Sequence, residues 1–163
     1  MRDAQRAKVY AAEAFVRTVF NRAAEHGMRS VEFFGTQLTL PPEGRFASVE
    51  SVRRYVDDVL ALPMVCRQWP GTAPLRVRAR RGATAAHYEY RDGVGTIAVP
   101  DRDAAGWALR ELVVLHELAH HLCSVLPPHG PDFVSTMCTL TALVMGPEAG
   151  YVLRVVYAKE GVR

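Results

Sequence analysis

A five-residue motif in the last third of the chain constrains the fold more than any other feature of the sequence. His116, Glu117 and His120 form an H-E-x-x-H pattern within a long apolar run. Two histidines at this spacing project from nearly the same line of an α-helix, so both imidazoles can reach one ion. Glu117 lies about 100° around the helix from His116, where it can reach a metal-bound water without binding the metal. The motif therefore predicts a divalent metal site on a helix.

The residues around the motif predict that this helix is buried. We expect one helix from Ala104 to Leu126, in which the motif supplies almost all the polar residues after Glu111. A helix that is apolar on most sides is normally buried. Because an unpaired buried charge is costly, the two histidines and the glutamate need partners, and a metal ion would satisfy all three.

A catalytic zinc site usually has three protein ligands, so the two motif histidines need one more. We favour His129, because the preceding prolines end the motif helix and Gly130 permits a tight turn that would return the chain beside it. Glu148 is the main alternative, since one class of zinc peptidase takes its third ligand from a glutamate on a later helix. Asp132 is a further alternative, and His129 would then be a solvated loop residue. We expect one zinc ion per chain, with iron, cobalt, nickel and manganese left open.

Two motifs together resemble a known family. His-Glu-Leu-Ala-His at 116–120, followed by His-Gly-Pro-Asp-Phe at 129–133, is similar to the SprT-like zinc metallopeptidases, whose pattern is H-E-x-x-H, a variable spacer and H-G-x-x-F. The opening segment Arg2–Glu13 and the stretch Ala108–Leu115 also resemble a small metallohydrolase family of actinobacteria and their phages. This second resemblance spans the whole chain.

The resemblance implies a zincin-like fold, a protein or peptide substrate, and a role for each motif residue. It assigns His116, His120 and His129 as zinc ligands and Glu117 as the general base. The expected reaction is hydrolysis of a peptide bond, in which Glu117 takes a proton from the zinc-bound water and passes it to the leaving amine. Two alternatives remain: a regulatory module that binds metal without catalysis, and a hydrolase of a non-peptide substrate.

Length and periodicity predict a single α+β domain over residues 1–163. A small, mostly antiparallel sheet of three or four strands should pack against the motif helix and several further helices. The other expected helices are 3–26, a helix that Ser48 or Ser51 caps and that ends near residue 62, 131–145 and 147–160. The expected strands are 31–40, 75–80, 86–90 and 95–99, with a hairpin turn at 91–94. If Thr96–Val99 lies at the sheet edge beside the motif helix, its free amides could pair with an extended peptide.

Composition favours a cytoplasmic protein that does not enter a membrane. The start of the chain lacks the apolar core of a signal peptide, and no apolar stretch is long enough to span a bilayer. Three isolated cysteines form no disulfide framework and no C-x-x-C zinc ribbon of the kind that longer SprT-like proteins use with DNA. The alternating arginines at 76, 78 and 80, followed by Arg81, could contact nucleic-acid phosphates, but we favour a solvated strand face. The sequence does not indicate an oligomeric state.

Overall fold

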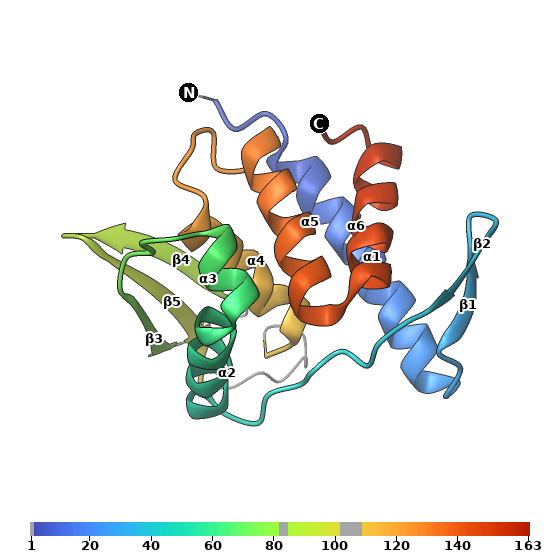
Figure 1. Ribbon diagram of the computed structural model, residues 1–163, viewed down its shortest axis with the longest axis horizontal. Coiled ribbons are helices and arrows are strands. Elements are labelled where there is room, and N and C mark those ends of the chain that lie inside the picture. The colour runs from blue at the N-terminus through green and yellow to red at the C-terminus, as the bar shows by residue number, and fades with distance from the viewer. Residues whose placement is uncertain (1, 82–84, 102–108) are drawn as a thin grey trace. The chain divides into compact units, whose positions relative to one another are not determined.

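The computed structural model describes residues 2–81, 85–101 and 109–163. Over these residues the chain has the predicted α+β fold, with six helices and two small sheets (Figure 1). The helices are α1 (Arg6–Glu25), α2 (Val49–Ala61), α3 (Pro63–Gln68), α4 (Glu111–Leu122), α5 (Pro131–Met145) and α6 (Pro147–Lys159). The strands are β1 (Ser30–Phe33), β2 (Thr36–Thr39), β3 (Leu75–Arg80), β4 (His87–Arg91) and β5 (Val94–Pro100).

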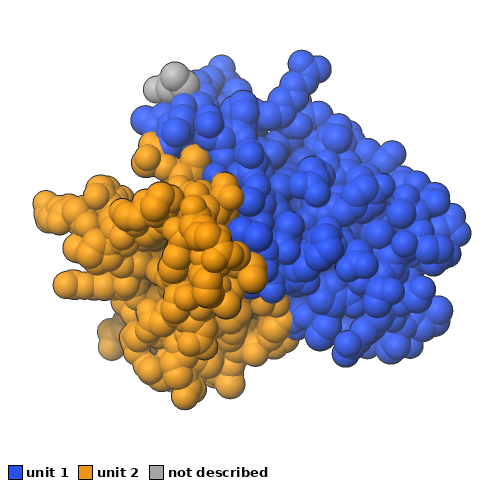
Figure 2. Space-filling view, in the orientation of Figure 1, with its two compact units in different colours: residues 1–43, 125–163 blue, residues 44–124 orange. Residues whose placement is uncertain are grey.

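The chain divides into two compact units, which are coloured separately in Figure 2. Unit 1 consists of residues 1–43 and 125–163, and unit 2 of residues 44–124. That residues 1–163 act as one domain stays a prediction.

Unit 1 is built from α1, α5, α6 and the β1–β2 hairpin. Helix α6 packs against both α1 and α5. The buried face of α1 includes Val9, Ala12, Val16 and Phe20, which recur at the spacing of an amphipathic helix. Prolines occupy the first position of α5 and of α6, where the missing N–H would have no helical partner. The predicted C-terminal ends of these helices are correct to within one residue, but α1 begins at Arg6 and not at residue 3.

The predicted single strand over 31–40 is wrong, because this segment folds into a hairpin. Strand β1 pairs antiparallel with β2, and Phe33 lies opposite Thr36. The two turn residues, Phe34 and Gly35, have φ angles of 46° and 82°. Two successive positive φ angles are typical of the tight turns that suit hairpins. Phenylalanine is uncommon at such a position, so the sequence did not reveal the turn.

Unit 2 contains a three-stranded sheet in the order β3-β5-β4. The β4–β5 hairpin was predicted, and its turn residues Asp92 and Gly93 have φ angles of 50° and 81°. Strand β3 runs parallel to β5, so only one of the two strand pairs in this sheet is antiparallel. The expected mostly antiparallel sheet is therefore only partly correct. Strand β5 is central, so the condition that Thr96–Val99 lies at the sheet edge is not met.

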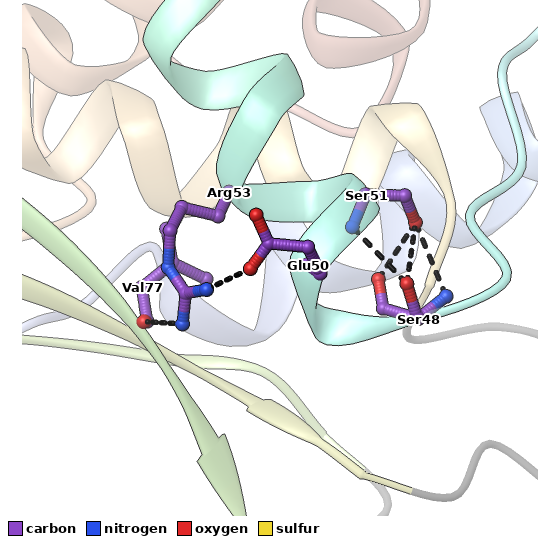
Figure 3. A network of polar contacts seen from close by, with 5 residues as sticks. All are labelled: Ser48, Glu50, Ser51, Arg53 and Val77. Atoms are coloured by element: carbon purple, nitrogen blue, oxygen red, sulfur yellow. Dashed lines mark hydrogen bonds and ion pairs between the residues drawn. The ribbon is translucent and has the colours of Figure 1, made fainter.

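Helix α2 packs against β3, and a set of polar contacts fixes its first turns (Figure 3). Ser48 caps the helix through a capping box with Ser51, in which each side chain bonds the backbone N–H of the other residue. Arg53 forms an ion pair with Glu50 and donates a hydrogen bond of 3.0 Å to the carbonyl of Val77 on β3. These contacts join the capped end of α2 to the sheet.

Helix α4 is shorter than predicted: it begins at Glu111 and ends at Leu122. Arg110 has an extended backbone and forms an isolated bridge with Arg45. The carbonyl of Leu109 accepts a hydrogen bond of 2.9 Å from the N–H of Phe46. These backbone groups are therefore used outside the helix. Residues 104–108 of the predicted helix lie outside the described residues, and the expected continuation to residue 126 is wrong because residues 123–126 are not helical.

Candidate metal centre

Helix α4 holds the motif on a rigid, buried support. Every residue from Leu112 to Ala119 is buried. Glu111 fixes the first turn, because its side chain accepts a hydrogen bond of 2.9 Å from the N–H of Gly44 and another from the hydroxyl of Tyr55. The helix also contacts β4 and β5. The motif side chains therefore start from a backbone that is tied to unit 2 at several points.

His116 and His120 point toward one another from successive turns of α4. Their Nε2 atoms are 3.1 Å apart, and their rings meet edge to face with centroids 4.8 Å apart. Two nitrogens bound to a tetrahedral zinc ion lie about 3.3 Å apart, given a zinc–nitrogen distance of about 2.05 Å. The observed separation thus suits two ligands of one ion, as well as an N–H···N hydrogen bond.

His121 is held by strand β4 and by the segment that precedes β3. Its Nε2 lies 2.9 Å from the carbonyl oxygen of Ala73 and its Nδ1 lies 3.1 Å from the hydroxyl of Tyr88. Because a carbonyl only accepts, Nε2 carries the proton and Nδ1 accepts from Tyr88. Burial lowers the pKa of His121, although the hydrogen bond to Ala73 acts in the opposite direction. These contacts make His121 a packing residue of unit 2.

Tyr88 contacts both His121 and His120, and so connects the anchored ring of His121 to the motif. Its ring lies nearly parallel to that of His120, with centroids 6.2 Å apart and an interplanar angle of 12°. Burial, with a smaller contribution from Tyr90, raises the pKa of Tyr88. Its hydroxyl therefore stays protonated at neutral pH and remains a donor to His121.

His129 lies two residues before the start of α5 and is not a solvated loop residue. Only 4% of it is exposed, and its ring packs against Phe133 and Tyr10 with centroid separations of 5.0 Å and 5.3 Å. Its Nδ1 lies 2.7 Å from Oδ2 of Asp3. Its backbone carbonyl accepts a hydrogen bond of 3.1 Å from Gln5. Asp3 was not recognised from the sequence, because no spacing links two residues at opposite ends of the chain.

In the parts of the chain that the structure describes, one group of three residues has the side chains and spacing to hold a metal ion. Each of His116, His120 and His129 offers a ring nitrogen, and these atoms lie within 4.8 Å of one another. The alternative ligands Glu148 and Asp132 do not belong to this group. Three imidazoles match zinc in ligand type and in the number that a catalytic site uses.

The general base predicted beside this group, Glu117, is 7% exposed and lies between two ligand candidates on α4. Its role as a base stays a prediction.

The arginine row lies on β3, as expected. Arg76 and Arg78 are exposed, whereas Val77 between them is buried. Arg78 donates a hydrogen bond of 3.0 Å to Glu89 on β4. This arrangement agrees with the solvated strand face that we favoured, and a nucleic-acid partner stays a prediction.

No family model matches this chain, and neither a curated protein nor a solved structure shows significant similarity to it. The resemblance to SprT-like peptidases therefore still depends on the motifs alone. Within residues 2–81, 85–101 and 109–163, none of the helices has the length and apolar character needed to cross a bilayer. The cytoplasmic location stays a prediction.

Proposed function

We propose that this chain is a zinc-dependent metallohydrolase that cleaves peptide bonds, with a zincin-like fold. The grouping of His116, His120 and His129, with ring nitrogens within 4.8 Å of one another, is the observation that carries the proposal. Glu117 beside this group supports hydrolysis over a purely structural metal site. A structural zinc site is normally closed by four protein ligands, whereas this group supplies three.

Each motif residue then has a defined task. The three histidines would hold the ion. When bound, zinc would lower the pKa of a water molecule and polarise the carbonyl of the scissile bond. Glu117 accepts the proton of the attacking water and delivers it to the leaving nitrogen. His121, fixed by Ala73 and Tyr88, holds α4 against the sheet and so keeps His120 in place.

Metal content tests the ligand set. We expect wild-type protein purified without chelators to hold about one zinc ion per chain by inductively coupled plasma mass spectrometry. His129→Ala should lose the ion, and Glu148→Ala, the matched control, should retain it. Loss in Glu148→Ala but not in His129→Ala would move the third ligand to Glu148. Wild type that binds no zinc even after zinc is added would refute the proposal and leave the His116–His120 contact as a hydrogen bond.

Activity tests the role of Glu117. Zinc-loaded protein should generate new N-termini in a mixture of unstructured peptides, detected by mass spectrometry. Glu117→Gln should lower the rate about 10²–10⁴-fold while zinc content stays unchanged, because the amide cannot accept the proton. Glu148→Gln serves as the control. A zinc-loaded wild type that cleaves no peptide would favour either the non-peptide hydrolase or the non-catalytic module.

A further inference from the structure

We propose that Asp3 is a positioning residue of the zinc centre, because it sets the tautomer of His129 and turns the correct ring nitrogen toward the metal. This inference rests on the proposed function, since it concerns the third ligand of the same centre. It adds the N-terminal segment to the set of residues on which zinc binding depends.

The contact between Asp3 and His129 selects one of the two ring nitrogens. Oδ2 of Asp3 lies 2.7 Å from Nδ1 of His129, and the two side chains are 22% and 5% exposed. A carboxylate accepts a hydrogen bond, so Nδ1 carries the proton. Nε2 is then left with a lone pair, and it is the atom that can bind zinc. Metal-binding histidines commonly donate their other N–H to a carboxylate in this way.

Neighbouring contacts hold the N-terminal segment in the position that this contact requires. The side chain of Gln5 donates to the carbonyl of His129 at 3.1 Å and to the carbonyl of Arg163 at 2.6 Å. Its oxygen accepts from the N–H of Arg163, also at 2.6 Å. Gln5 thus joins the backbone of His129 to the last residue of the chain. Asp3, two residues before Gln5, is kept beside the imidazole.

Protein contacts satisfy only one of the two oxygens of the Asp3 carboxylate among the described residues. Oδ1 is buried and makes no hydrogen bond to any of the described residues. A buried polar atom without a partner is costly, and in a native structure it calls for an explanation. We attribute the burial of this carboxylate to its contact with His129, because its negative charge makes the imidazole a better donor of the Nε2 lone pair. Replacing Asp3 should therefore weaken zinc binding.

A purely structural role for Asp3 makes a different prediction. If the carboxylate only ties the N-terminal segment to His129, its removal would loosen that segment and leave the equilibrium between the two ring tautomers unchanged. The tautomer of His129 in the zinc-free, full-length protein therefore separates the two roles. Long-range proton–nitrogen NMR spectra report which ring nitrogen carries the proton.

The experiment compares Asp3→Ala and Asp3→Asn with wild type, and uses Asp132→Ala as a matched control. Asp132 is an exposed carboxylate in the first turn of α5, outside the histidine group. Zinc affinity is measured by competition with a chromophoric chelator, and the tautomer by NMR. Asp3→Ala should weaken zinc binding about 10–100-fold and convert part of His129 to the form protonated on Nε2. Asp3→Asn should lose less affinity and keep the wild-type tautomer, because its amide oxygen still accepts from Nδ1. Asp132→Ala should change neither.

Two results would overturn the inference while leaving the proposed function intact. One is wild-type zinc affinity in Asp3→Ala. The other is weaker zinc binding with an unchanged tautomer, which would make Asp3 a structural tether. If wild type itself binds no zinc, the proposed function fails and this inference fails with it.

Discussion

Replacing Gly95 by alanine should force helix α4 away from the sheet of unit 2. A Cβ atom at Gly95 would lie 2.4 Å from Nδ1 and 2.8 Å from Cε1 of His121, and 3.0 Å from the hydroxyl of Tyr88. Ordinary contact begins at 3.4 Å, so the ring would have to move by 3.4 − 2.4 = 1.0 Å. The ring is not free to do so, because its Nε2 is bound to the carbonyl of Ala73 at 2.9 Å.

The expected cost combines two effects. Overpacking of a filled site costs about 1–3 kcal/mol. Loss of the Tyr88–His121 hydrogen bond adds about 0.5–1.5 kcal/mol. We therefore expect Gly95→Ala to lower the free energy of unfolding by about 1.5–4.5 kcal/mol. Gly44→Ala is the matched control in the same unit, because its Cβ would meet Glu111 at an ordinary 3.5 Å. Its effect should stay within about 0.5 kcal/mol.

Urea denaturation of the zinc-free protein measures these free energies and keeps metal binding out of the comparison. A double-mutant cycle with His121→Ala tests the cause, since removing the ring removes the obstacle. The double mutant should be more stable than the sum of the single effects predicts, by at least about 1 kcal/mol. Single effects that add to within about 0.5 kcal/mol would refute the proposed collision.

Further predictions concern stability elsewhere in the chain. Burial raises the pKa of the Cys138 thiol to about 11 from the usual 9.0. The folded state therefore favours the protonated thiol, whose contribution to stability is complete below pH 9 and disappears as the pH rises toward 11. The total is about 3 kcal/mol, since one pH unit corresponds to about 1.4 kcal/mol. Urea denaturation between pH 8 and pH 11 should show a shallower loss of stability in Cys138→Ala than in wild type, and equal slopes would contradict this reasoning. Ser48→Ala should lower the free energy of unfolding by about 0.5–2 kcal/mol through loss of the α2 cap. The exposed Ser124→Ala should change it by less than about 0.5 kcal/mol in the same assay, and a similar loss in both variants would exclude the cap as the cause.

Helices and turns with local signals were predicted well. The cap residue Ser48 starts α2, and the prolines at 131 and 147 start α5 and α6. Asp92 and Gly93 form the expected hairpin turn between β4 and β5. These signals act between residues a few positions apart, where backbone preference and hydrogen bonding decide the conformation. The pairing of His116 with His120 belongs to the same class, because helix geometry alone places side chains four residues apart on one face.

Local signals of this kind did not predict the contacts between distant parts of the chain. Alternation indicated strands but not that β3 would pair in parallel with β5, because pairing depends on which sheet surface buries the apolar side chains. The start of α4 at Glu111 depends on backbone bonds to residues 44–46, which compete with the helix for the same groups. Asp3 reaches His129 across 126 positions, and only the folding of unit 1 brings these side chains together. The sequence by itself determined the motif and its helix, whereas tertiary structure decided which residues hold its histidines in place, because those residues are neighbours in space and not along the chain.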